Sequence, residues 1–185
     1  MNNNTIPYIH VGSGSFSMQR LQIIIDSNIF TPIAVVDLDR KKTLKNLSKI
    51  NFKKVDLKKR IYKTISEACK KHNAKACFIY ASAESHASLC IMSLKSNLHT
   101  YCVKSIALNK KEFKKIISEK NKKKNLVFFQ GYNNQWNEAS LKMQEWINSK
   151  DGIGKMIGGK CITWGRQDLS KLKNKDHLVN PGMFF

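Results

Sequence analysis

Short apolar runs and segments of helical period alternate along most of this chain. The apolar runs, rich in β-branched and aromatic residues, predict β-strands at 6–11, 33–38, 75–82, 99–104 and 125–132. Segments with apolar positions every three or four residues predict helices at 16–28, 40–50, 64–73, 84–96, 109–120 and 134–150. Near-continuously apolar strands separated by helices are typical of a doubly wound parallel sheet with helices on both faces. The pattern therefore predicts an α/β fold over roughly residues 5 to 132.

The pattern changes after the segment DGIG at 151–154. Residues 155–166 alternate apolar and polar side chains, which is typical of a strand in a half-exposed antiparallel sheet. We therefore predict a first domain over residues 1–133. A second region over 134–185 would hold a long helix and the first strand of an incomplete α+β domain. Because one strand cannot form a sheet by itself, we expect a second copy or a partner chain to supply the missing strands.

Two short motifs predict where helices begin and end. Thr64 and Glu67 have the spacing of a capping box, in which each side chain bonds to the other residue's backbone N–H. Asn97 follows the helix predicted at 84–96 and suits the left-handed conformation that ends many helices. Both motifs support the helix boundaries that the periodicity predicts.

A glycine turn follows the first predicted strand, with the sequence Gly12-Ser13-Gly14-Ser15-Phe16-Ser17. A dinucleotide-binding, Rossmann-like fold has G-x-G-x-x-G at this place. Its first glycine permits the tight turn, and its second lets the backbone approach the pyrophosphate. Ser17 replaces the third glycine and is small enough for fairly close packing of helix on strand. We therefore predict cofactor contacts at Gly12, Gly14 and Phe16; the alternative is a Rossmann-like domain that binds no nucleotide.

A carboxylate follows the second predicted strand. Asp37 lies 25 residues after Gly12, where a carboxylate can accept hydrogen bonds from both hydroxyls of an adenosine ribose. The same charge would repel the 2′-phosphate of NADP, although Arg40 and Lys41 follow closely and would soften that preference. We therefore expect NAD or NADP as the cofactor and favour NAD.

Two polar residues mark the carboxyl ends of later strands, the edge at which open α/β sheets bind ligands. His86 opens the helix after strand 75–82, and Lys104 ends strand 99–104. The segment HASLCIMSLKSNLHTYCVKSIAL contains both residues, and FFQGYNNQW and INSKDGIGKMIGGKCITWG follow it. Together these segments resemble the Gfo/Idh/MocA family of NAD(P)-dependent sugar and cyclitol oxidoreductases over roughly residues 5 to 166.

The resemblance implies a reaction and roles for particular residues. In that family the lysine of a Glu-Lys-Pro motif orients the substrate and assists proton transfer from the hydroxyl that is oxidised, and this role falls to Lys104. Hydride would pass between the nicotinamide and a sugar-like or cyclitol-like alcohol. Ser82, Glu84 and His86 are further candidates for cofactor contact.

The chain departs from the family pattern beside Lys104 and at its end. Val103 and Ser105 stand where the family has glutamate and proline, so a cis peptide between Lys104 and Ser105 is not expected. The family's Asp-x-x-x-His motif would come after the final NPGMFF. We therefore expect a truncated, catalytically impaired oxidoreductase. The alternative is a non-catalytic nucleotide-binding or interaction module that pairs with a partner chain.

The chain is strongly basic, with 33 Lys and Arg against 13 Asp and Glu among 185 residues and a formal net charge of +20. Only four basic residues are arginine, the residue best suited to bidentate phosphate and base contacts. The lysines are spread over several predicted helices, so we expect solvated lysine faces and no specific nucleic-acid partner. A basic nucleic-acid binder is the third alternative.

The sequence predicts a cytoplasmic protein without a membrane partner. No apolar run reaches the roughly 20 residues that span a bilayer, and the N-terminus lacks the pattern of a signal peptide. Five cysteines are scattered without the spacing of a zinc site, so we expect reduced thiols and no metal.

Overall fold

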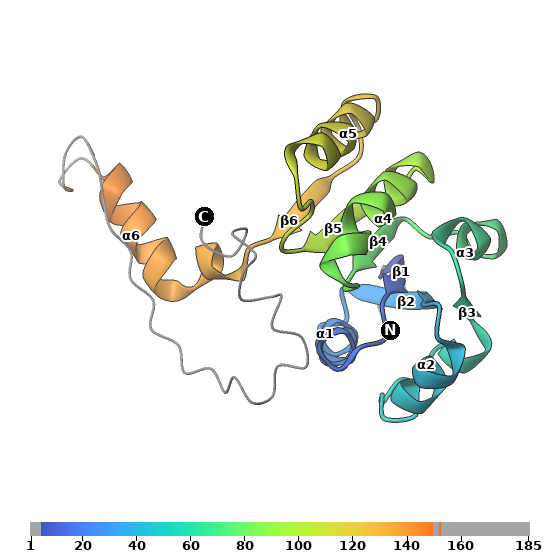
Figure 1. Cartoon of the computed structure of the whole chain (residues 1–185). Coiled ribbons are helices and arrows are strands. Elements are labelled where there is room, and N and C mark those ends of the chain that lie inside the picture. The colour runs from blue at the N-terminus through green and yellow to red at the C-terminus, as the bar shows by residue number, and fades with distance from the viewer. Residues whose placement is uncertain (1–4, 150–151, 153–185) are drawn as a thin grey trace, which may run out of the picture. The chain divides into compact units, whose positions relative to one another are not determined.

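A six-stranded parallel sheet forms the centre of the first domain (Figure 1). The computed structural model describes residues 5–149 and Gly152. The strand order is β3-β2-β1-β4-β5-β6, and every neighbouring pair is parallel. The strands are β1 (Ile6–Val11), β2 (Phe30–Val36), β3 (Ile61–Tyr62), β4 (Ala76–Ile79), β5 (His99–Val103) and β6 (Phe128–Gly131). The chain order reverses between β1 and β4, which is where such sheets bind ligands.

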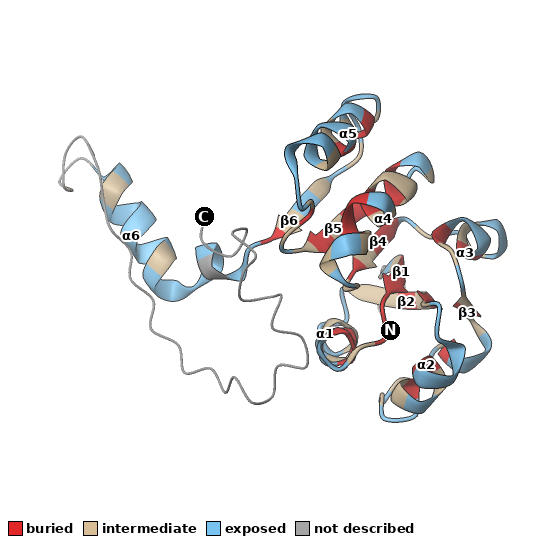
Figure 2. Cartoon of the chain, viewed as in Figure 1, coloured by how far each residue is buried: buried red, intermediate tan, exposed pale blue. Residues whose placement is uncertain are grey.

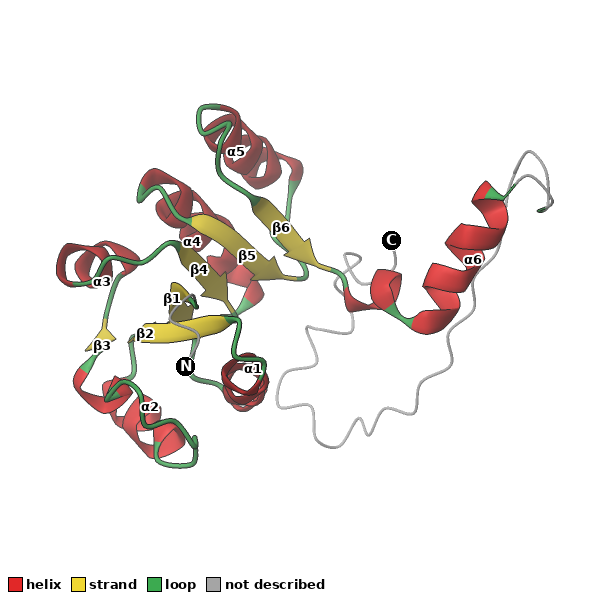
Figure 3. Ribbon diagram, turned by 180° about the vertical axis from the view of Figure 1, so that it is seen from behind, coloured by secondary structure: helices red, strands yellow, loops and turns green. Residues whose placement is uncertain are grey.

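Helices cover both faces of this sheet (Figure 3). They are α1 (Ser15–Asp26), α2 (Arg40–Leu47), α3 (Ile65–Lys71), α4 (Ala83–Lys95) and α5 (Lys110–Asn121). Successive strand residues point to opposite faces. Tyr8 therefore packs in a cluster with residues of α1 and α2, whereas Ile9 packs in a second cluster with residues of α3, α4 and α5. The predicted Rossmann-like, doubly wound α/β fold is confirmed.

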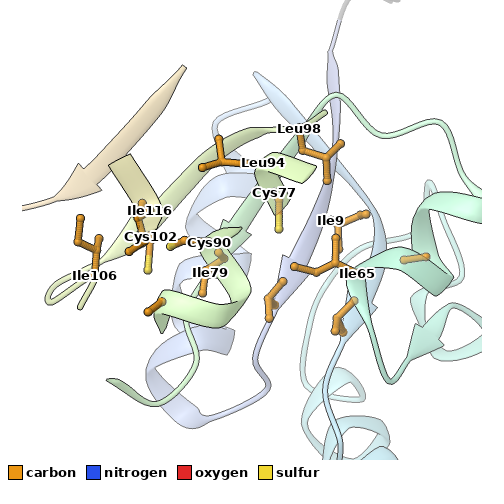
Figure 4. Close-up of a cluster of buried hydrophobic side chains, with 14 of the residues drawn as sticks. Ile9, Ile65, Cys77, Ile79, Cys90, Leu94, Leu98, Cys102, Ile106 and Ile116 are labelled. Atoms are coloured by element: carbon orange, nitrogen blue, oxygen red, sulfur yellow. The ribbon is translucent and has the colours of Figure 1, made fainter. Parts of the chain in front are cut away.

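Most of the buried side chains of this domain belong to the strands and to the sheet-facing sides of the helices (Figure 2). Figure 4 shows the larger cluster, in which Ile9, Ile79 and Leu94 are fully buried. Cys77, Cys90 and Cys102 lie in the same cluster as free thiols. The core therefore holds the carboxyl ends of β1, β4 and β5 rigidly beside one another.

Both predicted helix-end motifs are present. The Thr64 hydroxyl accepts a hydrogen bond from the Glu67 backbone N–H at 3.1 Å, and the Glu67 carboxylate accepts one from the Thr64 N–H at 3.3 Å. Asn97 has φ 58°, the left-handed value that the sequence predicts. Both predictions are confirmed. Such motifs can be predicted from sequence because each depends only on residues a few positions apart.

The short strand β3 and the 3₁₀ turn η1 (Leu57–Lys59) before it were not predicted. Two residues are too few to show an alternating pattern. The strand matters for the site because the Asp37 N–H donates to the Tyr62 carbonyl at 3.0 Å. Pairing with β3 therefore holds the backbone at the end of β2.

The chain divides into two units, and the boundary along the sequence lies between Gly131 and Tyr132. In the second unit, the turn η2 (Asn133–Trp136) precedes helix α6 (Glu138–Asn148), which has no buried residue. The domain boundary predicted after residue 133 stays a prediction. The strand predicted at 155–166 lies outside the described residues. No helix in the described part of the chain is both long enough and apolar enough to cross a membrane.

Candidate functional site

Gly12 must be glycine for two geometric reasons. Its φ of 101° is a conformation that L side chains rarely adopt. A Cβ at this position would also lie 2.5 Å from the Tyr80 carbonyl oxygen. The Gly12 N–H donates to the Val36 carbonyl at 2.9 Å. The first glycine of the turn therefore lets β1 end in close contact with the chain leaving β4.

Gly14 leaves space at the start of α1. It is the N-cap of that helix, and a Cβ added to it would meet no atom within 4 Å. The first N–H groups of any helix lack partners within the helix, and its N-terminus carries a partial positive charge. Together these features make the start of α1 suited to an anionic group such as a phosphate.

Ser13 places a buried polar group in the same turn. The residue is 1% exposed, and its Oγ has no hydrogen-bond partner among the described residues. Its carbonyl accepts a hydrogen bond from Asn46 Nδ2 at 2.8 Å, which holds the backbone of the turn. A buried hydroxyl without a partner is costly, so a ligand oxygen that reached Ser13 would gain a hydrogen bond that the protein leaves unmade.

A cavity of about 610 Å³ opens beside this turn, at the carboxyl ends of β1, β2 and β4. Four of the predicted cofactor residues line it: Gly12, Gly14, Asp37 and Ser82. Sequence reasoning missed other lining residues, which include Ser13, Lys42, Lys63, Tyr80 and Ser85. Ser13 could have been found, since it lies inside the glycine motif. Lys63 could not, because it follows the strand that the pattern missed.

Asp37 lies at the end of β2, on the wall of this cavity. Its Oδ1 accepts a hydrogen bond from the Asp39 backbone N–H at 2.9 Å. The other carboxylate oxygen can still accept hydrogen bonds. The carboxylate is therefore held where it can bind a hydroxyl group of a ligand in the cavity.

The cations that line the cavity together with Asp37 are not the ones that the sequence singled out. The Arg40 guanidinium donates to the Ile61 carbonyl at 3.1 Å, which ties α2 to β3. Lys42 and Lys63 line the cavity instead, whereas Arg40 and Lys41 do not. An ammonium group acts as a point charge on phosphate, so these two lysines are the side chains that could favour a 2′-phosphate.

His86 does not line the cavity and is a buried residue of α4. It is 1% exposed, and its Nδ1 and Nε2 lie 2.7 Å and 2.9 Å from the carbonyl oxygens of Ser105 and Ala81. Carbonyl oxygens only accept hydrogen bonds, and a neutral imidazole has one N–H, so such a ring donates to the chain at the end of either β4 or β5. His86 therefore positions backbone, and its direct contact with a cofactor stays a prediction.

Lys104 follows β5 directly and is exposed at the carboxyl edge of the sheet. It does not line the 610 Å³ cavity. The peptide between Lys104 and Ser105 is cis, so the expectation of a trans bond was wrong. That expectation rested on the statistical preference of non-proline residues for trans bonds, which says nothing about the surrounding structure.

The last two predicted cofactor residues, Phe16 and Glu84, lie outside the lining of the cavity. Phe16 is 47% exposed in the first turn of α1, with the Arg20 guanidinium carbon 4.7 Å from its ring centroid. Glu84 is exposed in the first turn of α4, whose N-cap is Ser82. Both side chains are near the start of a helix that borders the site, and their cofactor contacts stay predictions.

The cysteines near the sheet edge are not suited to nucleophilic chemistry. A hydrogen bond with the Cys90 thiol, together with burial, raises the pKa of Cys102. Burial likewise raises the pKa of Cys77. The thiolate is the reactive form of cysteine, so these residues stay protonated. No cluster of potential metal ligands occurs within residues 5–149.

A larger hollow of about 810 Å³ lies on the outer side of α4 and α5. Its lining includes Lys95, Lys110, Lys111, Lys114, Lys115 and Lys122. It contains no glycine turn and no helix N-cap with open space, so only its charge suggests a ligand. We therefore place the candidate site at the glycine turn, and the absence of a specific nucleic-acid partner stays a prediction.

No family model matches the sequence. The chain is 26% identical over 136 residues to a myo-inositol 2-dehydrogenase of Thermotoga maritima, which covers 74% of this chain and 38% of that protein. The chain thus spans less than half the length of this curated relative.

Solved structures show the same fold. A myo-inositol 2-dehydrogenase of Lactobacillus plantarum matches with a TM-score of 0.66 and 15% identity, over 78% of this chain and 42% of that one. The WlbA dehydrogenase of Bordetella pertussis, solved with NADH and UDP-GlcNAcA, matches with a TM-score of 0.64 and 15% identity, over 78% of this chain and 43% of that one. The sequence similarity confirms the resemblance of this chain to dehydrogenases of the Gfo/Idh/MocA type, and the solved structures show that it shares their fold.

Proposed function

We propose that this chain binds NAD or NADP at the glycine turn, as the nucleotide-binding part of a Gfo/Idh/MocA-type oxidoreductase. The observation that carries the proposal is the buried Ser13 hydroxyl, which has no hydrogen-bond partner within the described part of the chain, beside the open start of α1 at Gly14. Both features meet in one cavity with the Asp37 carboxylate. A dinucleotide offers a pyrophosphate for the first two groups and ribose hydroxyls for the third.

Different residues of the cavity would bind the pyrophosphate and the adenosine ribose of the dinucleotide. The N–H groups at the start of α1 and the Ser13 hydroxyl would bind phosphate oxygens, and the open space at Gly14 would let them approach the backbone. Asp37 would accept hydrogen bonds from the adenosine ribose, which favours NAD. Lys42 and Lys63 would attract a 2′-phosphate, so we expect the preference over NADP to be modest.

When bound, the nicotinamide would supply a hydride acceptor or donor for a sugar-like or cyclitol-like alcohol. Lys104 can donate hydrogen bonds to a substrate hydroxyl, which would orient it and accompany the movement of its proton. His86 would hold the backbone that carries this lysine through its contact with the Ser105 carbonyl. Because Val103 supplies no carboxylate beside Lys104, we expect weak turnover or none from these 185 residues.

Isothermal titration of the purified chain with NAD and with NADP tests the binding proposal. We expect saturable binding of both, with a lower Kd for NAD. The absence of binding at millimolar concentrations of either cofactor would refute the proposal. Binding by the folded Gly14→Ala variant as tight as that of the wild type would show that the ligand lies elsewhere.

Turnover is tested separately, by following the absorbance of reduced nicotinamide with myo-inositol and related sugars as substrates. Oxidation that is lost in Lys104→Ala, while NAD affinity is retained, would support the role of Lys104 and contradict the expected impairment. Binding without turnover would favour the alternative of a non-catalytic nucleotide-binding module. Sedimentation of the chain with and without NAD would then show whether it pairs with a second copy.

A further inference from the structure

A hydrogen-bonded serine occupies the third position of the glycine turn. Ser17 lies in the first turn of α1, is 1% exposed and contacts His10 of β1. Its Oγ lies 2.7 Å from the carbonyl oxygen of Gly12 and 2.8 Å from Nε2 of His10. The side chain therefore fills space that a third glycine would leave empty, and it joins the helix to the first residue of the turn.

The direction of these two hydrogen bonds follows from the chemistry of their atoms. A carbonyl oxygen only accepts, so the Ser17 hydroxyl donates to Gly12. That hydroxyl then accepts from His10, whose proton must be on Nε2. His10 Nδ1 is buried and has no hydrogen-bond partner among the described residues. Burial lowers the pKa of His10 to about 3, which keeps the ring neutral with this single proton.

The His10 ring is itself held in place. It is fully buried and stacks on the ring of Tyr80, with 5.1 Å between centroids and 22° between planes. Tyr80 also presents the carbonyl oxygen against which Gly12 packs. Gly12 is therefore held at its N–H by β2 and at its carbonyl by Ser17, so the turn has little freedom to rotate.

We propose that Ser17 and His10 together are positioning residues, which hold the turn from Gly12 to Gly14 in its cofactor-binding geometry in place of a third glycine. The proposal rests on the proposed function, dinucleotide binding at this turn. It has an unexpected consequence for Ser17→Gly. That variant recreates the full G-x-G-x-x-G pattern, yet it should weaken binding, because it leaves the Gly12 carbonyl and the His10 N–H without partners.

Titration calorimetry of wild type and variants with NAD, below their melting temperatures, tests this proposal. We expect Ser17→Gly and Ser17→Ala to raise the Kd for NAD about tenfold, which corresponds to about 1.4 kcal/mol. The Kd for adenosine should not change, because adenosine carries no phosphate to meet the turn. A purely structural defect would not distinguish the two ligands. His10→Gln, which keeps an N–H donor, should bind NAD more tightly than His10→Leu.

Ser27→Ala is the matched control at the other end of α1. Ser27 also donates to a backbone carbonyl, that of Ile24 at 2.7 Å, but it lies at the C-cap of the helix. We expect this variant to keep the wild-type Kd for NAD.

Nitrogen-15 NMR of the His10 side chain supplies a readout without cofactor. We expect only the Nε2–H tautomer from about pH 7 to about pH 5. In Ser17→Ala, the Nε2 proton should lose its protection against exchange with solvent. A protonated ring or an Nδ1–H tautomer would overturn the proposal. If the wild type binds NAD, an unchanged Kd for NAD in both Ser17→Gly and Ser17→Ala would also overturn the proposal. A wild type that binds no NAD would instead overturn the proposed function itself.

Discussion

Replacing each glycine of the turn by alanine should separate folding from binding. At Gly12, alanine would have to adopt φ near 101° and would place Cβ 2.5 Å from the Tyr80 carbonyl oxygen. The strained backbone costs about 1–3 kcal/mol, and the overpacking costs about 1–3 kcal/mol more. A total of about 4 kcal/mol is a large part of the 5–15 kcal/mol that stabilises a typical domain. At roughly 3 °C per kcal/mol, the Tm would fall by about 12 °C.

At Gly14 the same substitution should leave stability nearly unchanged. Its φ is −65°, and an added Cβ meets nothing within 4 Å. Alanine is a poorer N-cap than glycine by about 0.5–1 kcal/mol, but it reduces the freedom of the unfolded chain by about 0.4–1 kcal/mol. The two effects nearly cancel. The new methyl group would occupy the space that the pyrophosphate needs, and a clash of about 2 kcal/mol raises the Kd for NAD roughly 30-fold.

Thermal unfolding followed by circular dichroism and titration calorimetry with NAD measure the two effects separately. Gly12→Ala should lower the Tm and Gly14→Ala should not, whereas Gly14→Ala should lose affinity while folded. A Gly12→Ala protein as stable as the wild type would falsify the reasoning about the close contact with β4. Tight NAD binding by Gly14→Ala would place the pyrophosphate away from the start of α1.

Three further predictions follow from the contacts around the site. In calorimetric titrations, Lys63→Ala should raise the Kd for NADP at least about threefold more than the Kd for NAD. The control variant Lys41→Ala should change neither Kd. Equal effects of Lys63→Ala on the two cofactors would exclude Lys63 from a 2′-phosphate site. Burial lowers the pKa of His10 to about 3, so between about pH 6.5 and pH 4 only the unfolded state takes up its proton, and the free energy of unfolding falls as the pH falls. Measured by urea unfolding over that pH range, the free energy of unfolding of the wild type should fall by about 3 kcal/mol more than that of His10→Phe. Equal decreases in the two proteins would contradict the buried, neutral ring. His86→Phe should lower the free energy of unfolding by about 1–3 kcal/mol in urea, because it removes the ring N–H that can donate to one of two backbone carbonyls; a change below about 0.5 kcal/mol would show that water replaces the ring.

The structure brings four of the residues that the sequence singled out to one cavity, and their contact with a cofactor stays a prediction. Gly12 and Gly14 have the conformation and the space that the glycine pattern implies, and Asp37 lies in the same cavity. His86 was chosen for the cofactor because it follows a strand end, but its ring is directed at backbone carbonyls. Position at a strand end predicts the neighbourhood of a side chain and leaves its direction open.

The sequence by itself determined five of the six strands of the sheet, its two covered faces and the glycine turn, because the periodicity of apolar residues and short capping motifs are local properties. Only the tertiary structure showed that β3 brings Lys63 to the cavity, that the Ser13 hydroxyl is buried with no partner among the residues described, and that Ser17 bonds to both Gly12 and His10. These features join residues whose contacts depend on how strands pair and helices pack. Burial and hydrogen-bond partners of that kind are set by neighbours in space, which a linear pattern does not record.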